Sequence, residues 1–334
     1  MAKKLLLSLL GCIALLGLGG FALLTYLTSV PGKPHQGALP ALTGEERAIA
    51  TTLKRHIATI AARPHNIAHY GELEKVAAYL EATLTSHGYA VGRQDYVADG
   101  MTVRNIDVVI EPSATTGNPE VIVVGAHYDS AGNAPGANDN GSGTAVVLEL
   151  ARLLADMQGK SGKRIRLVLF VNEEPPYFQT DDMGSLRYAK LLAERKERVT
   201  AMFSLETLGY YSGEPGSQHY PAPFGVMFPD RGDFVSFVGL INSRPLVQDA
   251  MRSFRAHTSF PSIGGVAPGA IPGIDWSDHW AFAEHGFQAI MITDTAIFRY
   301  PHYHKRTDTP DKVDNERLAR VTKGIERVVR DLAR

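Results

Sequence analysis

The chain has 334 residues, and a hydrophobic content of 44% suits a packed core, so disorder is not expected. Its 34 basic and 35 acidic residues leave a net charge of −1, which gives no electrostatic reason to expect nucleic acid as a partner. The one cysteine, Cys12, lies in an apolar N-terminal segment, so a metal in the globular part would have to use His and carboxylate ligands.

The N-terminal segment is long and apolar enough to cross a membrane. Lys3 and Lys4 precede an uncharged stretch, Leu5–Val30, which is longer than the roughly 20 residues that span a bilayer. The positive-inside rule then places the rest of the chain outside the cytoplasm, in the periplasm or the extracellular space. Two alternatives remain, a cleaved signal that yields a secreted protein and a lipoprotein, because the stretch LLGC at residues 9–12 resembles a lipoprotein box.

The remaining chain divides into a Pro- and Gly-rich linker over residues 31–40, after the membrane segment 1–30, and a folded domain over residues 41–334. Strand-like and helical patterns alternate along this domain, which predicts an α/β fold with a mixed, mainly parallel central sheet flanked by helices. The expected helices are Gly44–Ala62, Glu72–His87, Ser142–Met157, Gly184–Glu197 and a piece near Val247–Ala256. The expected strands are Val103–Ile110, Val121–Val124, Ile165–Val171 and Thr200–Leu205.

Residues 210–274 are rich in Gly, Pro and aromatic residues. We expect them to form an insertion over the C-terminal edge of the sheet, where substrate contacts usually lie.

His127 and Asp129 follow the end of the expected strand Val121–Val124. Their spacing of two residues puts both side chains on one face if the chain stays extended. A metal-binding His commonly gives its second ring proton to a carboxylate, so Asp129 is a natural orienting partner for His127. A His and an Asp in an ordinary hydrogen-bonded turn explain the pattern equally well.

Asp139 lies in the stretch GANDNGSG, residues 136–143, just before an expected helix. Asn, Asp and Ser at such a place commonly cap the helix, and we interpret Asn140 and Ser142 in this way. Asp139 stands near the strand end that carries His127, where a carboxylate could bridge two cations.

Acidic and histidine residues end three further segments. Glu173 and Glu174 follow the apolar run of the expected strand Ile165–Val171, Glu206 ends the next strand, and His304 lies near the C-terminus. Neighbouring residues on an extended chain point to opposite sides, so the two adjacent glutamates need different partners. Two His and three carboxylates, with no Cys, suit a pair of hydrolytic zinc ions.

The ordered motifs GAHYDS, GANDNGSG, NEEPP, SLETLGYY, SDHWAF and YHKRTDTPDKVD resemble the M28 family of zinc peptidases, over about residues 63–313. The resemblance implies a zinc exopeptidase-like fold, a peptide substrate and two zinc ions per chain. It assigns His127 and Glu206 to one zinc ion, Glu174 and His304 to the other, and Asp139 to both. It makes Glu173 the general base and Asp129 the orienting partner.

Some positions depart from the family pattern or compete for a role. Many members carry Asp where this chain has Glu206, which puts the occupancy of that zinc site in question. His302 competes with His304, which we prefer because Asp308 and Thr309 follow it at the family's usual offset. The candidates for substrate contact are Asp278, His279, Arg299 and Tyr303. For His279 a structural hydrogen bond is the alternative.

The expected function is zinc-dependent hydrolysis of peptide bonds by an exopeptidase, in the first place an aminopeptidase. One alternative is a glutaminyl cyclase-like acyltransferase with one zinc ion, and the other is a non-catalytic, receptor-like relative. A serine hydrolase is disfavoured because no Gly-x-Ser-x-Gly elbow occurs at a strand end. The sequence does not indicate the residue preference, the end of the peptide that is cut, or the oligomeric state.

Overall fold

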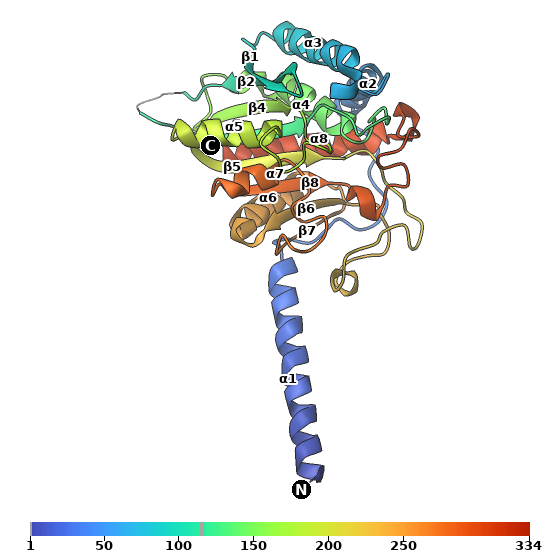
Figure 1. The fold of residues 1–334 in the computed structure, drawn as a ribbon. Coiled ribbons are helices and arrows are strands. Elements are labelled where there is room, and N and C mark those ends of the chain that lie inside the picture. Colours follow the sequence, from blue (N-terminus) through green and yellow to red (C-terminus); the bar gives the residue numbers. More distant parts are fainter. Residues whose placement is uncertain (1, 114–116) are drawn as a thin grey trace.

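An eight-stranded sheet forms the centre of the molecule (Figure 1). The structure is a computed structural model and describes residues 2–113 and 117–334, so Met1 of the expected 1–30 segment lies outside the described residues. The strands lie in the order β1-β2-β4-β3-β5-β8-β6-β7. Their bounds are Gly92–Ala98 (β1), Met101–Ile110 (β2), Glu120–His127 (β3), Arg164–Phe170 (β4), Arg198–Glu206 (β5), Val235–Leu240 (β6), Ser262–Ala267 (β7) and Ala289–Thr293 (β8).

The middle of the sheet is parallel. Strand β3 pairs in parallel with β4 and β5, and β5 pairs in parallel with β8. Antiparallel pairs join β1 to β2, β2 to β4 and β6 to β8, while β7 is parallel to β6. The mixed, mainly parallel sheet confirms the fold expected from the sequence. Because parallel strands end at the same edge, this arrangement brings the ends of β3, β4 and β5 together.

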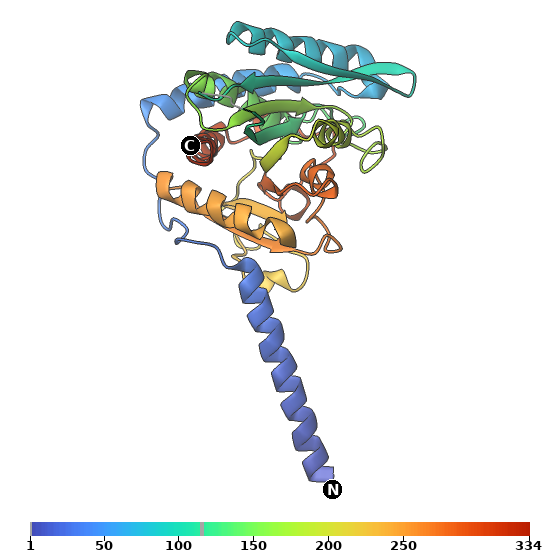
Figure 2. The ribbon, with the colours of Figure 1, turned by 90° about the vertical axis from the view of Figure 1, so that its left-hand side faces the viewer.

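Helices cover both faces of the sheet, as Figure 2 shows from the side. The helices are α1 (Ala2–Thr28), α2 (Gly44–Ile60), α3 (Tyr70–Ser86), α4 (Gly141–Leu154), α5 (Gly184–Glu194), α6 (Arg244–His257), α7 (His279–Glu284) and α8 (Asn315–Leu332). The apolar faces of α2, α3, α4, α6 and α8 share one core with the sheet, whereas α5 and α7 pack on its other face around Phe170. Both faces of the central strands are thus buried, which explains their continuous apolar runs.

The strongly periodic segments form helices and strands close to their expected bounds. Helix α2 begins with a capping box, in which Thr43 and Glu46 each bind the backbone N–H of the other. Residues 210–274 differ from the expectation, because they contain β6, α6 and β7 and extend the sheet beyond β8. Strands β6 and β7 are short and contain glycine, so their sequences lack a clear period.

Helix α1 projects away from the sheet in both views (Figures 1 and 2). It is the one helix among the described residues that is long and apolar enough to cross a membrane, over Lys3–Thr28. Most of its described apolar side chains before Leu24 are uncovered, with Leu5 75% and Leu16 76% exposed. An apolar surface of this length in the open is expected of a membrane-crossing or signal helix rather than of a core helix.

Candidate active site

The candidate site lies at the C-terminal edge of the parallel strands. His127 is the last residue of β3, Glu206 is the last residue of β5, and Glu173 and Glu174 follow the end of β4. Asp139 precedes the first turn of α4, which returns from the end of β3 across one face of the sheet. The edge where ligands usually bind in open α/β sheets therefore gathers four of the five expected metal ligands.

Asp139 lies between the two histidines. Its Oδ1 is 3.4 Å from Nε2 of His127, and its Oδ2 is 3.0 Å from Nε2 of His304, which reaches the site from the loop after β8. Nε2 of His127 also lies 3.3 Å from Oε2 of Glu206, and Nε2 of His304 lies 3.1 Å from Oε2 of Glu174. The five side chains thus form two His–Glu pairs, with one carboxylate of Asp139 between them.

The two adjacent glutamates have different neighbours. Glu174 approaches His304, whereas Oε2 of Glu173 lies 3.7 Å from Nε2 of His127. Ligand atoms of His127, Asp139 and Glu174 lie within 4.8 Å of one another, and those of His127, Glu173 and Glu206 form a second such group. Imidazole and carboxylate groups whose ligand atoms lie this close together can hold a metal ion between them.

Several buried atoms of the cluster make no well-aligned hydrogen bond in the described part of the chain: Nε2 of His127, Oδ2 of Asp139 and Oε1 of Glu174. Other ligand atoms lie close to the first two. Such unpaired polar atoms are costly unless another ligand binds them. They fit a metal ion, because neutral imidazole and carboxylate groups are ligands that zinc accepts.

The protonation of the cluster leads to the same conclusion. Burial, followed by repulsion from Asp139, raises the pKa of Glu174 to about 8, and burial raises the pKa of Glu173 well above its ordinary value. Burial alone would lower the pKa of His304, but the carboxylates of Asp139 and Glu174 raise it to about 10. Protons thus offset the negative charge of the cluster, and a divalent cation would take their place.

Two further buried carboxylates hold the backbone of the ligand segments. The Asp129 carboxylate accepts from the backbone N–H of Glu173 at 3.1 Å and of Glu174 at 3.2 Å. The Asp308 carboxylate accepts from the backbone N–H of Asn138 at 2.9 Å and of Asp139 at 3.1 Å. Each of these acids fixes two consecutive residues at the site.

Asp129 therefore differs in detail from the expectation. Nδ1 of His127 lies 3.1 Å from the backbone carbonyl oxygen of Asp129 and 3.7 Å from the carboxylate of Asp129. The carbonyl takes the orienting place expected of the carboxylate, because β3 ends at His127 and the chain turns there. Sequence reasoning missed the contact of Asp129 with Glu173 and Glu174.

Glu206 has a partner that sequence reasoning also missed. Oγ of Ser277 donates to its Oε2 at 2.8 Å, and Oγ of Ser204 lies 2.7 Å from Oγ of Ser277. All three residues are buried. These contacts fix the orientation of the Glu206 side chain. The only signal in the sequence was the SDHWAF motif, which begins with Ser277.

The four candidates for substrate contact lie in unlike places. Asp278 and His279 have no exposed surface, and Nε2 of His279 lies 2.8 Å from the carbonyl oxygen of Ile274. Arg299 is 7% exposed and donates to Gln218 and to the carbonyl oxygen of Phe234. The structure thus places these three behind the surface of the site, with His279 and Arg299 holding loops.

Tyr303 remains at the surface of the site, and its ring stacks on that of His304 at 3.8 Å. The rival ligand His302 instead bonds through Nδ1 to the hydroxyl of Thr307 at 2.9 Å.

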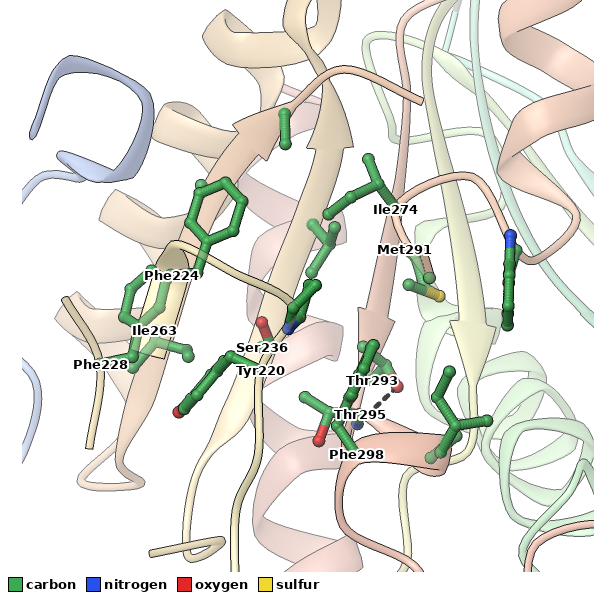
Figure 3. Close-up of a pocket in the computed structure, with 18 of the residues that line it drawn as sticks. Tyr220, Phe224, Phe228, Ser236, Ile263, Ile274, Met291, Thr293, Thr295 and Phe298 are labelled. Carbon is green, nitrogen blue, oxygen red and sulfur yellow. Dashed lines mark hydrogen bonds between the residues drawn. The ribbon is translucent and has the colours of Figure 1, made fainter. Parts of the chain in front are cut away.

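An apolar pocket adjoins the cluster (Figure 3). Glu206 and Tyr303 line it at the cluster, and Thr28 at the end of α1 lines it too. Most of its wall is apolar, with Met291 of β8 and the rings of Tyr220, Phe224, Phe228 and Phe298. The pocket can thus hold an apolar group next to the candidate metal ligands.

The chain resembles known peptidases in sequence. A model of peptidase family M28 matches residues 105–329. The uncharacterized protein YfbL of Escherichia coli K12 is 35% identical over 309 residues, which cover 90% of each chain. A probable leucine aminopeptidase 1 of Trichophyton verrucosum is 28% identical over 230 residues. The matched region covers 65% of this chain and 56% of that protein.

Solved structures show the same fold. A zinc aminopeptidase of Bacillus subtilis matches 71% of this chain and 52% of its own, with a TM-score of 0.55 and 27% identity. An aminopeptidase of Aneurinibacillus sp. strain AM-1 matches 87% of this chain and 95% of its own, with a TM-score of 0.68 and 18% identity. A glutaminyl cyclase of Fimbriiglobus ruber matches 90% of this chain and 99% of its own, with a TM-score of 0.62 and 18% identity.

Proposed function

Because the chain belongs to peptidase family M28, a family of zinc metallopeptidases, we propose that it is an aminopeptidase that uses two zinc ions to remove residues from the amino end of peptides. The position of Asp139 carries this proposal. One of its oxygens faces His127 and the other faces His304, as a ligand shared by two ions must.

In this proposal His127 and Glu206 bind one zinc ion, Glu174 and His304 bind the other, and Asp139 binds both. When bound, the ions would polarise the peptide carbonyl and acidify the attacking water. Glu173 would take the proton of that water and pass it to the leaving amine. Its carboxylate is next to His127 and its backbone N–H is held by Asp129, so it is fixed beside the ligands.

We further propose that α1 anchors the protein in a membrane with the catalytic domain on the extracytoplasmic side. The proposal rests on the apolar span Lys3–Thr28 and on the two lysines at its start.

Exchange of each adjacent glutamate for glutamine tests the division of labour, because the amide keeps size and polarity but removes the charge. Glu173→Gln should keep both zinc ions and lose about 10²- to 10⁴-fold in kcat, the usual contribution of general acid–base catalysis. Glu174→Gln should lose zinc and regain part of its activity in excess zinc. Glu214→Gln, at an exposed loop position, is the matched control.

The measurements are zinc content by mass spectrometry and hydrolysis of aminoacyl, dipeptidyl and carboxy-terminal substrates. One zinc ion per chain together with cyclisation of amino-terminal glutamine would favour the glutaminyl cyclase alternative. Equal zinc content and equal loss of activity in Glu173→Gln and Glu174→Gln would rule out their separate roles.

A further inference from the structure

The end of α1 is packed against the catalytic domain. Leu24 is only 9% exposed and belongs to an apolar cluster with Phe224 and Ala267. Gly265 of β7 lies directly under the last turn of the helix, where a Cβ would come within 3.0 Å of the carbonyl oxygen of Leu27. A side chain here would be in tight contact, and the helix end would have to shift by a few tenths of an ångström to admit it, so glycine allows the close approach. The packing fixes the angle between the helix and the sheet.

Two arginines hold the same junction. Nε of Arg244 donates to the carbonyl oxygen of Tyr26 at 3.2 Å, and its guanidinium carbon lies 4.0 Å from the centre of the Tyr26 ring. Arg255 donates to the carbonyl oxygens of Pro31 and Gly32 at 2.8 Å each. The start of the expected linker is therefore bound to the domain and does not separate it from the helix.

The length of the free part of α1 matches a bilayer. Leu5 to Leu24 covers about 30 Å at 1.5 Å per residue, which is the thickness of the hydrocarbon core. Leu24 is also the first buried side chain of α1 among those that the structure describes. If α1 spans a membrane, as proposed above, the contact at Leu24 thus lies at the membrane surface.

A loop of the catalytic domain lies at this level. It runs from Tyr220 to Phe228, includes a short turn of helix at Phe224–Val226, and lies beside the upper end of α1 in both views (Figures 1 and 2). Val226 is 80% exposed, more than any other large apolar side chain that the structure describes after α1. An apolar tip next to a membrane helix is typical of residues that enter the lipid interface.

The loop also forms part of the pocket. Tyr220, Phe224 and Phe228 line it together with Thr28 of α1, and Glu206 and Tyr303 line the same pocket at the candidate metal site. The lining of the pocket thus extends from the candidate metal site to the end of α1, where the domain would meet the membrane.

We propose that the loop Tyr220–Phe228 inserts its tip at Val226 into the interfacial layer of the bilayer, and that the pocket takes the apolar end of peptides held at the membrane surface. The membrane part rests on α1 as an anchor, and the substrate part also rests on the proposed aminopeptidase function. The substrate class is peptides that an apolar segment or a lipid chain retains on the bilayer.

The position of the loop can be measured without any activity. The full-length chain, with Cys12→Ser to remove its one cysteine, would carry an environment-sensitive fluorophore at Val226→Cys in phosphatidylcholine nanodiscs. Nitroxide lipids labelled near the headgroup should quench this label at least about twofold, since interfacial side chains lie within about 10 Å of that depth. The matched control is Val97→Cys, 61% exposed on β1, away from α1 (Figure 1). Equal quenching at the two positions, or a chain that does not enter nanodiscs, would overturn the proposal.

A charge at the loop tip tests the substrate class. Val226→Asp should lower kcat/KM about tenfold for a lipid-anchored peptide in the nanodisc, equivalent to about 1.4 kcal/mol, and leave a soluble peptide with the same amino end unchanged. Val97→Asp should affect neither substrate. An equal effect of Val226→Asp on both peptides would refute the delivery of substrate from the membrane. Absence of hydrolysis by the unmodified protein would refute the proposed function, whereas the quenching result would still decide the position of the loop.

Discussion

Replacement of Asp308 by Asn should weaken zinc binding although Asp308 is not a proposed zinc ligand. Its carboxylate accepts from the backbone N–H of Asn138 and Asp139, and from the hydroxyl of Tyr300 at 2.6 Å. An amide has one acceptor oxygen, so one of the two backbone N–H groups would face an NH₂ group. The loss of one hydrogen bond to a charged acceptor costs about 1.5–3 kcal/mol.

Asn138 N–H and the Tyr300 hydroxyl both donate to Oδ1 of Asp308, so the amide oxygen should take that position and the NH₂ group should face the N–H of Asp139. The cost then falls on the backbone of Asp139, the residue proposed to bind both ions. We expect the affinity for zinc to fall about 10- to 100-fold, as for other groups that orient ligands. Competition with a chromophoric chelator measures the affinity, and thermal unfolding measures the loss of stability. Tyr300→Phe, which keeps the carboxylate and both N–H contacts, should change zinc affinity much less. Asp311→Asn, at a side chain that is 67% exposed, is the surface control. Unchanged zinc affinity in Asp308→Asn would refute the role of Asp308 in placing Asp139.

Zinc binding at pH 7 should release protons, because the pKa of His304 is raised to about 10 and that of Glu174 to about 8 in the cluster without a cation. Calorimetry in buffers of different ionisation enthalpy measures this release, and a heat independent of the buffer would contradict it. Acid should destabilise the domain through His56. Burial, and then Arg55, lower the pKa of His56 to about 4 in the folded chain. Below about pH 6.5 the unfolded chain therefore takes up this proton while the folded chain does not, which favours unfolding. Between pH 7 and pH 5 the free energy of unfolding should fall by about 2 kcal/mol more in the native chain than in His56→Gln. Chemical denaturation at each pH measures this free energy, and an equal fall in the two chains would refute the prediction.

The sequence predicted many of the elements whose pattern is set locally, although the amphipathic helix α8 and the strand β8 were not among the expected elements. The strands β3, β4 and β5 are buried on both faces, so each is mostly apolar, and the polar residues that end them were visible for the same reason. The expected ligands were found by this route and by the order of the motifs. The structure places His127, Asp139, Glu174, Glu206 and His304 in one cluster, while their roles as ligands stay predictions.

What the sequence did not indicate depends on contacts between distant segments. Asp308 binds the backbone N–H of Asn138, 170 residues away in the chain, and Ser277 binds Glu206, 71 residues away. No local pattern marks such pairs, because an acid or a serine in a loop usually meets only water. Strand β7 was missed for a related reason. Its two glycines leave little apolar pattern, and one of them, Gly265, lies in tight contact with α1, which is far away in the sequence.

The junction of α1 with the domain has a consequence for the order of folding. The helix end at Tyr26 and the segment after it at Pro31 bind Arg244 and Arg255, which lie 218 and 224 residues later in the chain. At about 5–20 residues per second, the ribosome needs roughly 10 to 45 s to complete that stretch. Helix α1 is thus made long before its partners in α6 and β7, so docking of the domain onto its own N-terminal helix belongs to the last steps of maturation.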